Sequence, residues 1–310
     1  MKPVYIINGF LESGKTEFIS FTLDQPYFKI KGTTLLLLCE EGEVEYDPKL
    51  LKKSRTVLEV IDSEEAFNPQ HLLEIEKRVN PERIIIEYNG MWNCKDMKLP
   101  FHWTVEQQIT TINGATFPMY YSNMKSLVAE MVRKSELIIF NRCDGIKDLG
   151  SYKRNVKAVN PAAEVIFEDK NGEINQLFEE DLPYDLKQDT LDFDGNAYGI
   201  WYIDSMESLD RYIGKTIIFD AMVMKPKKFP KGYFVPGRMA MTCCAEDMAF
   251  IGYACRYAGV DELKEKQWVK VTAVVKKEYF SDYKGEGPVL DAISVVPTKK
   301  PADDIINFGA

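Results

Sequence analysis

The chain has 310 residues, of which 45% are hydrophobic and 28% charged, a composition typical of soluble globular proteins and long enough for two domains. Six cysteines do not make a disulfide scaffold, no apolar run reaches the roughly 20 residues that span a bilayer, and no signal peptide precedes the first strand, so we expect a cytoplasmic protein without a membrane span. The net charge of −9 argues against a general nucleic-acid binder, because the phosphate backbone attracts positive charge.

Residues 4–7 predict a short buried strand and residues 17–21 a helix. Between them, residues 9–16 fit the phosphate-binding pattern G-x-x-x-x-G-K-[ST] at every fixed position. Backbone N–H groups of such a loop and the following helix N-terminus point at phosphates. We expect Lys15 to reach the β- and γ-phosphates and to be catalytic, and Thr16 to hold Mg²⁺. The predicted nucleotide-binding residues here are Gly9, Glu12, Ser13, Gly14, Lys15 and Thr16.

An apolar run at residues 33–39 predicts a strand covered on both faces, and it ends in the acidic segment 40–47. Carboxylates crowded near a bound triphosphate are costly unless a cation neutralises some of them. We therefore expect a switch segment in which Glu40 is catalytic and Asp47 is a metal ligand. A solvated acidic loop is the alternative interpretation.

Strands are predicted at residues 57–61 and 83–87, with a helix at 71–79 between them. Glu87 lies at the carboxyl end of its strand, where P-loop proteins keep the carboxylate that holds Mg²⁺, so it is both a metal and a catalytic candidate. Residues 87–90 have the shape of a D-x-x-G switch with Glu in place of Asp. Gly90 can present its N–H to a γ-phosphate because no side chain blocks the approach.

Residues 107–113, 136–140 and 164–167 predict further strands, and residues 123–132 a helix. The second of these strands is followed by residues 141–144, which are similar to the N-K-x-D guanine box. Asp144 would accept from guanine N1–H and its amine, Asn141 would tie the box to the phosphate loop, and Arg142 replaces the usual lysine. Strands alternating with helices predict an α/β fold of the P-loop type, a parallel sheet with helices on both faces and ligands at the strand carboxyl ends.

The chain after residue 185 has a different composition. Residues 1–198 carry 23 Lys+Arg against 33 Asp+Glu, whereas residues 199–310 carry 16 against 15. We expect a nucleotide domain at 1–185, a linker at 186–198 and a small, mainly β domain of OB type at 199–310. Its predicted elements are a helix at 207–212 and strands at 199–203, 213–219, 232–241, 248–257, 268–277 and 288–295.

Three cysteines of the second half are candidate metal ligands. Cys243 and Cys244 are adjacent, and neighbours in a strand face opposite sides, so only one of them could join Cys255 in binding Zn²⁺. The alternative is that these cysteines pack as small hydrophobic side chains.

Four stretches resemble the nucleotide-binding domain of the CobW/HypB/UreG family of metal-trafficking GTPases, closest to its CobW branch. Residues 8–16 resemble its G-F-L-G-[SA]-G-K-T-T loop, residues 39–47 its N-E-F-G-E-V-G-I-D segment, residues 83–90 its strand ending in E-[TS]-[ST]-G, and residues 141–144 its N-K-x-D box. The resemblance implies GTP hydrolysis with Mg²⁺, delivery of zinc or cobalt, and a client metalloprotein or metal transporter as partner. It leaves a homodimer open.

Residues 202–206 through 269–272 resemble the small C-terminal domain of bacterial membrane proteins encoded beside permeases, most strongly at 229–230 and 238–245. This second resemblance agrees with a role in metal handling.

The chain departs from the family in two places. Residues 48–82 hold no cysteine where the family usually carries C-x-C-C, and Glu12 replaces a loop glycine. A carboxylate near a triphosphate weakens binding, so we expect slow hydrolysis and modest affinity for guanine nucleotide. A non-hydrolysing GTP- or GDP-binding module that has lost chaperone activity and an ATP-using P-loop kinase are the alternatives.

Overall fold

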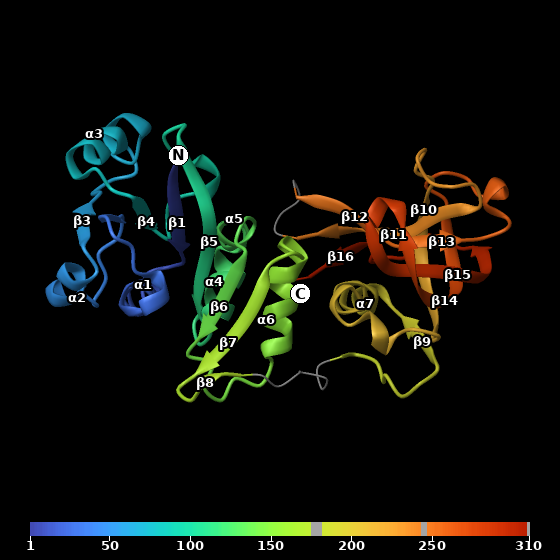
Figure 1. Cartoon of the computed structure of the whole chain (residues 1–310). Coiled ribbons are helices and arrows are strands. Elements are labelled where there is room, and N and C mark those ends of the chain that lie inside the picture. The colour runs from blue at the N-terminus through green and yellow to red at the C-terminus, as the bar shows by residue number, and fades with distance from the viewer. Residues whose placement is uncertain (175–181, 243–246, 309–310) are drawn as a thin grey trace. The chain divides into compact units, whose positions relative to one another are not determined.

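The computed structural model describes residues 1–174, 182–242 and 247–308. These residues form two units. The first contains residues 1–149 and 162–174, and the second contains residues 150–161, 182–242 and 247–308. Figure 1 labels their elements.

The first unit is built on one sheet of strand order β3-β2-β4-β1-β5-β6-β7-β8. Every neighbouring pair is parallel except β7 and β8, which are antiparallel. The strands are β1 (Lys2–Asn8), β2 (Thr34–Leu38), β3 (Thr56–Val60), β4 (Arg83–Glu87), β5 (Trp103–Asn113), β6 (Leu137–Asn141), β7 (Glu164–Asp169) and β8 (Gly172–Glu173). The predicted P-loop α/β fold with a parallel sheet is confirmed.

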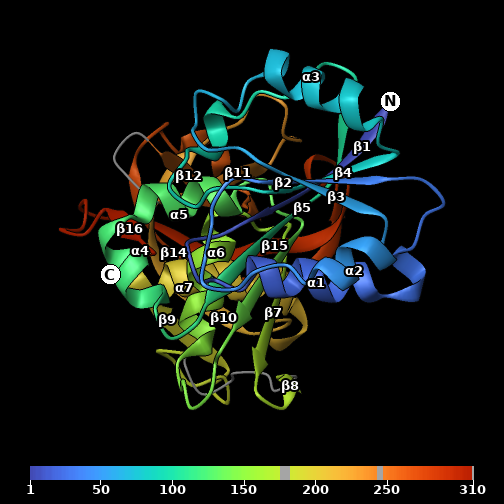
Figure 2. The same ribbon diagram turned by 90° about the vertical axis from the view of Figure 1, so that its left-hand side faces the viewer.

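Helices of this unit connect the strands and cover the sheet: α1 (Lys15–Asp24), α2 (Pro48–Lys53), α3 (Pro69–Val79), α4 (Phe117–Asn123) and α5 (Lys125–Val132). Between β6 and β7 the chain forms α6 (Leu149–Val159), nearly all of which belongs to the second unit. Figure 2 shows α3 on one side of the β3-β2-β4-β1 half of the sheet and α1 and α2 on the other. The helix predicted at 123–132 is α5, which begins at Lys125, whereas α4 was not predicted. α2 was not predicted either, because its six residues carry too short an apolar pattern.

The central strands are buried on both faces. Leu35 and Leu37 pack with Ile84 and Ile86 beneath α3, whereas Leu36 packs with residues of α1 on the opposite face. The near-continuous apolar runs of β2 and β4 follow from this double burial, which is typical of parallel sheets.

The second unit has a β-rich fold whose main sheet closes on itself. β10 pairs with β11 and β14, β11 with β13, and β15 with both β13 and β14, which completes a five-stranded ring in which only β13 and β15 are parallel. The predicted small β domain is confirmed as a barrel-like sheet. Its elements are β9 (Thr190–Phe193), α7 (Gly195–Glu207), β10 (Thr216–Met224), β11 (Tyr233–Met241), β12 (Met248–Gly252), β13 (Ala254–Arg256), β14 (Trp268–Phe280), β15 (Gly285–Pro297) and β16 (Ile305–Asn307).

The stretch predicted as a linker, residues 186–198, instead holds β9 and the start of α7. α7 continues through residues 199–203, where a strand was predicted, and the helix predicted at 207–212 is only a 3₁₀ turn at Leu209–Arg211. Tertiary packing explains why residues 199–203 form a helix instead of a strand. Trp201 of α7 is fully buried in the barrel core, and a Cβ on Gly199 would lie 2.4 Å from the Ile306 side chain of β16.

Among the residues described, no helix is long and apolar enough to cross a membrane.

Candidate nucleotide-binding site

The phosphate loop joins the end of β1 to the start of α1. Gly14 is the N-cap of α1, with φ 94°, and as a glycine it has no side chain to accept from the first N–H groups of the helix. Gly9 has φ 143°, and a Cβ there would lie 2.3 Å from the Thr111 carbonyl oxygen. Both glycines are therefore required by the backbone, and the loop has the form of an anion-binding turn.

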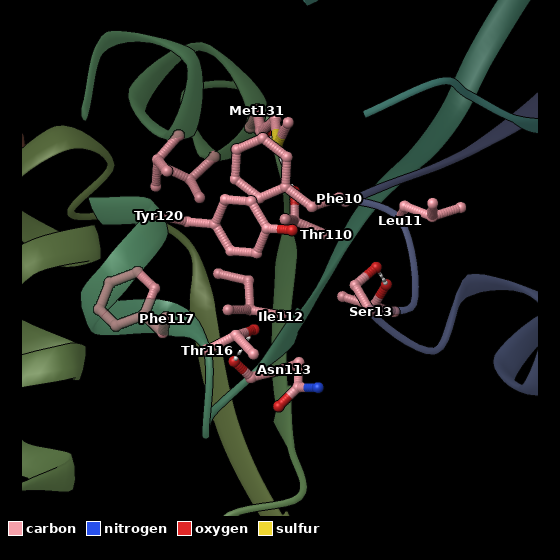
Figure 3. Close-up of a pocket in the computed structure, with 14 residues that line it drawn as sticks. Phe10, Leu11, Ser13, Thr110, Ile112, Asn113, Thr116, Phe117, Tyr120 and Met131 are labelled. Carbon is pink, nitrogen blue, oxygen red and sulfur yellow. Dashed lines mark hydrogen bonds between the residues drawn. The ribbon is translucent and has the colours of Figure 1, made fainter. Parts of the chain in front are cut away.

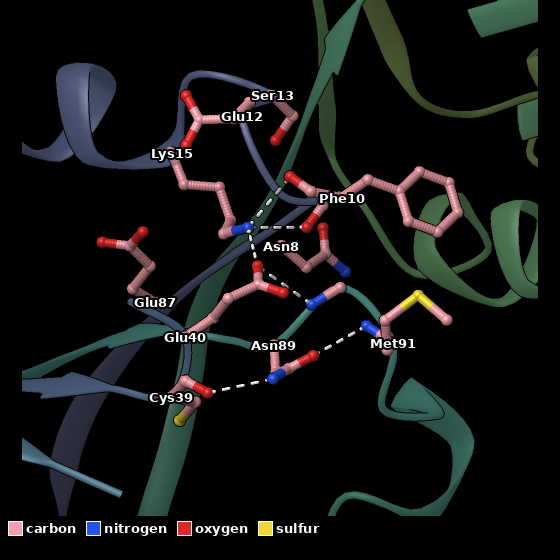
Figure 4. A network of polar contacts seen from close by, with 12 residues as sticks. Asn8, Phe10, Glu12, Ser13, Lys15, Cys39, Glu40, Glu87, Asn89 and Met91 are labelled. Carbon is pink, nitrogen blue, oxygen red and sulfur yellow. Dashed lines mark hydrogen bonds and ion pairs between the residues drawn. The ribbon is translucent and has the colours of Figure 1, made fainter. Parts of the chain in front are cut away.

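Lys15 is buried, with 4% of its side chain exposed. Its Nζ donates to Gly9 O at 2.8 Å, to Phe10 O at 3.0 Å and to Glu40 Oε2 at 2.6 Å (Figure 4). The Gly90 N–H points at the same Glu40 oxygen, 3.5 Å away. Lys15, Glu40 and Gly90, which were predicted separately, therefore meet at one point.

Thr16 and Glu87 also lie together, as expected for a pair that would hold Mg²⁺. Thr16 Oγ1 donates to Glu87 Oε1 at 2.9 Å, and the Tyr46 hydroxyl donates to Glu87 Oε2. Glu87 is 2% exposed, and this burial raises the pKa of its carboxyl. Oxygen donors suit Mg²⁺, and a bound cation would offset the cost of burying this carboxylate.

Tyr46 is a site residue that the sequence did not single out. It lies in the acidic segment 40–47 but is itself buried, and burial raises the pKa of its phenol above the ordinary value, so the hydroxyl keeps its proton and donates. The only signal was an aromatic residue at a position where the similar family segment has isoleucine.

Asp47, predicted as a metal ligand, lies at the start of α2. It is exposed and caps α2, with Oδ1 accepting from the Lys49 N–H at 2.9 Å. Among the described residues, no group of three or more His, Cys, Asp or Glu side chains could hold a metal ion.

Cys255 lies fully buried in the barrel core, and burial raises the pKa of its thiol well above the usual range. A metal ligand must be a thiolate, so this burial favours the alternative interpretation of a small hydrophobic side chain. Cys243 and Cys244 lie outside the described residues.

Glu12 adopts φ 60°, a left-handed conformation that glycine reaches without strain. Its Oε1 accepts from the Glu43 N–H at 3.0 Å, so the side chain ties the phosphate loop to segment 40–47.

Replacing Glu12 with glycine is expected to raise the affinity for guanine nucleotide roughly tenfold, because one negative charge near the phosphates is removed. The backbone should stay in place because glycine keeps φ 60° freely. Titration calorimetry with GDP and Mg²⁺ measures the change. Glu12→Gln keeps the side-chain acceptor and should give a similar gain, whereas unchanged affinity in both variants would show that this charge does not oppose binding.

The guanine-box residues begin at the last residue of β6, Asn141. Asn141 Nδ2 donates to Ser13 O at 2.7 Å, which is the contact with the phosphate loop that the sequence predicts. Arg142 donates to Glu12 O and, at 3.1 Å, to Glu17 Oε1. Asp144 is exposed, and its Oδ1 accepts a long bond of 3.4 Å from the Lys170 N–H, so the carboxylate is accessible to a base.

A small apolar pocket of about 20 Å³ adjoins the loop on the side of α4 and α5 (Figure 3). The Phe10 and Tyr120 rings stack in it, with centroids 4.1 Å apart, and Phe117 and Met131 also line it. The pocket was not predicted, because its walls come from two segments far apart in the sequence, one within residues 9–13 and the other within residues 110–132.

Comparisons with known proteins agree with this geometry. The family model described as CobW/HypB/UreG, nucleotide-binding domain, matches residues 3–167, and the model described as DUF1980 C-terminal domain matches residues 169–306. No curated protein sequence matches the chain.

Solved structures that the chain resembles include three proteins. Hydrogenase maturation factor HypB from Archaeoglobus fulgidus is 17% identical, with a TM-score of 0.41 over 56% of this chain and 84% of that one. Zn(II)-bound YjiA GTPase from E. coli is 14% identical, with a TM-score of 0.39 over 87% and 93%. HypB from Helicobacter pylori in complex with nickel is 14% identical, with a TM-score of 0.36 over 54% and 80%. Because the family model covers more than half of the chain, and its phosphate loop and strand-end residues lie together in the fold, this chain belongs to the CobW/HypB/UreG family of P-loop GTPases.

Proposed function

We propose that this protein binds GTP with Mg²⁺ and hydrolyses it slowly, in the service of metal delivery or metalloprotein maturation. The observation that carries the proposal is the meeting of Lys15, Thr16, Glu87 and Gly90 at the carboxyl ends of β1 and β4, beside the open N-terminus of α1. Phosphoryl transfer depends mainly on positioning and on neutralising charge, and these are the groups that do both.

Each residue has a definite part in this proposal. Lys15 and the loop N–H groups bind the phosphates, and Gly90 presents its N–H to the γ-phosphate. Thr16 and Glu87 would hold Mg²⁺, which supplies charge neutralisation on the phosphate oxygens. Slow turnover is expected because Glu12 and Glu40 add negative charge beside a triphosphate.

Zinc or cobalt would be the metal cargo, as the resemblance to the CobW branch of the family implies. Among the similar structures, HypB from Helicobacter pylori has been solved with nickel and YjiA with zinc. The client would be a metalloprotein or a metal transporter. We also propose that the boundary between the two domains lies between β8 and β9.

Thermal stabilisation tests the nucleotide directly. A ligand that binds only the folded protein raises its apparent stability by mass action, so GTP and GDP should raise the melting temperature at concentrations where ATP does not. Each nucleotide is measured with and without Zn²⁺, which reports the metal in the same experiment. Equal stabilisation by ATP would favour the P-loop kinase instead.

A second candidate is a module that binds GDP or GTP without turnover. The ion pair between Lys15 and Glu40 favours it, because the lysine that would act on the γ-phosphate is already engaged. Phosphate release measured over hours separates the two. A GTPase turns over repeatedly, whereas a binding module retains nucleotide.

Base selectivity is expected to depend on Asp144. Asp144→Ala should lower GTP affinity roughly 10- to 100-fold, because hydrogen bonds to a charged acceptor contribute about 1.5–3 kcal/mol. Competition between GTP and ATP measures the change, and ATP binding should be unaffected. Lys147→Ala removes a nearby exposed side chain and serves as the control. Equal loss of GTP and ATP binding in Asp144→Ala would contradict the guanine-box assignment.

A further inference from the structure

Glu40 has a position that its predicted catalytic role does not explain. Its Oε2 lies 2.6 Å from Lys15 Nζ and 3.5 Å from the Gly90 nitrogen. The side chain is 11% exposed, so this contact is shielded from water. Figure 4 shows the carboxylate between the lysine and the turn after β4.

Both donors around Glu40 serve the γ-phosphate: Gly90 is assigned to it in the proposed function, and Lys15 is expected to reach the β- and γ-phosphates. A carboxylate and a terminal phosphate group both present negatively charged oxygen to N–H donors, so they compete for the same position. The α- and β-phosphates are bound by the N–H groups of the loop and of the first turn of α1, and the β-phosphate shares only Lys15 with the γ-phosphate.

We propose that Glu40 is a specificity-determining residue that occupies the γ-phosphate position and so favours the diphosphate over the triphosphate. The inference rests on the proposed function. A triphosphate must displace the carboxylate from both donors before its last phosphate can bind. A diphosphate has no γ group, and Glu40 keeps its contact with Gly90.

The size of the effect follows from the population of the displaced state. The apparent affinity for the triphosphate equals the intrinsic affinity multiplied by the fraction of molecules in which Glu40 has left the site. If the carboxylate is in place in nine molecules out of ten, triphosphate binding is weakened roughly tenfold. Lys15 and Glu40 are both largely buried, which strengthens their attraction relative to a surface pair.

Segment 40–47 reinforces the contact because it is fixed at two further points. Glu43 N–H donates to Glu12, and the Tyr46 hydroxyl donates to Glu87. Glu40 is therefore the first residue of a segment that is held on both sides of the phosphate pocket, and its carboxylate is oriented before any ligand arrives.

Titration calorimetry tests the inference on the full chain with Mg²⁺, using GDP and the non-hydrolysable triphosphate GMPPNP. Glu40→Gln keeps the shape of the side chain and removes its charge. The ratio of GMPPNP affinity to GDP affinity should rise roughly tenfold or more. Glu41→Gln removes the same charge from an exposed neighbour and should leave the ratio within about twofold of the wild type.

A ratio in Glu40→Gln equal to that of the wild type overturns the inference while leaving the proposed function intact. Binding of neither nucleotide by the wild type overturns both. Melting temperatures verify that the variants fold, and Glu40→Ala should shift the ratio in the same direction if Glu40→Gln is poorly folded.

Discussion

Lys15→Ala is expected to lower the affinity for GTP roughly 100-fold and to reduce hydrolysis below detection. The substitution removes the cation that lies in the phosphate loop, and charge-assisted hydrogen bonds of this kind contribute about 1.5–3 kcal/mol each. It also leaves Glu40 without its partner beside the phosphates, which adds repulsion between like charges. Titration calorimetry with GMPPNP and a phosphate-release assay measure the two effects.

Lys49→Ala is the matched control, because Lys49 is exposed at the start of α2 and donates to Asp47 through its backbone N–H, which alanine keeps. It should bind and hydrolyse as the wild type does. Unchanged turnover in Lys15→Ala would contradict the phosphate site itself, and with it the proposed function.

Gly90→Ala is expected to impair both the site and the fold around it. A Cβ at this position would lie 2.4 Å from the Gly9 carbonyl oxygen and 2.6 Å from Phe10 Cα, which are backbone atoms that cannot swing aside. The turn after β4 must therefore move away from the phosphate loop, and the Gly90 N–H withdraws from the γ-phosphate position. We expect a loss of stability of about 1–3 kcal/mol, as for other overpacked sites, and a fall in hydrolysis of more than roughly tenfold.

Chemical denaturation measures the stability and phosphate release measures the turnover. Gly285→Ala is the control, because the nearest atom to a Cβ there is 3.9 Å away and its φ is not in the left-handed region. A Gly90→Ala protein with wild-type stability and turnover would show that the close approach of these two turns is not needed.

The site residues at strand ends could be predicted because a parallel sheet brings its carboxyl ends to one edge, whatever lies between the strands in sequence. Lys15, Thr16, Glu87, Gly90 and Asn141 were placed in this way. The alignment of strand ends does not predict which hydrogen bonds are made by side chains in the segments between the strands, because those bonds depend on the path of each segment. Tyr46 was therefore missed, although the segment that carries it was predicted.

The prediction of a strand at residues 199–203 in the second unit was wrong for a related reason. Residues 199–203 are apolar and rich in aromatic and β-branched side chains, which locally favours a strand. The barrel needs a helix there to fill its core, and Trp201 and Tyr198 do so. Two glycines in α7 reduce its intrinsic helix propensity, so only long-range packing reveals it.

The carboxylate of Glu87 accepts one hydrogen bond from the Thr16 hydroxyl at the start of α1 and one from the Tyr46 hydroxyl in segment 40–47. A cation that binds this carboxylate competes with both hydroxyls for its oxygens. Binding of the cation is therefore thermodynamically linked to the position of segment 40–47, which carries Tyr46. Such linkage is reciprocal. If the cation changes the affinity of a partner protein for this segment by some factor, binding of that partner changes the affinity for the cation by the same factor. A protein that engages residues 40–47 could thus load or unload the nucleotide's metal without touching the nucleotide.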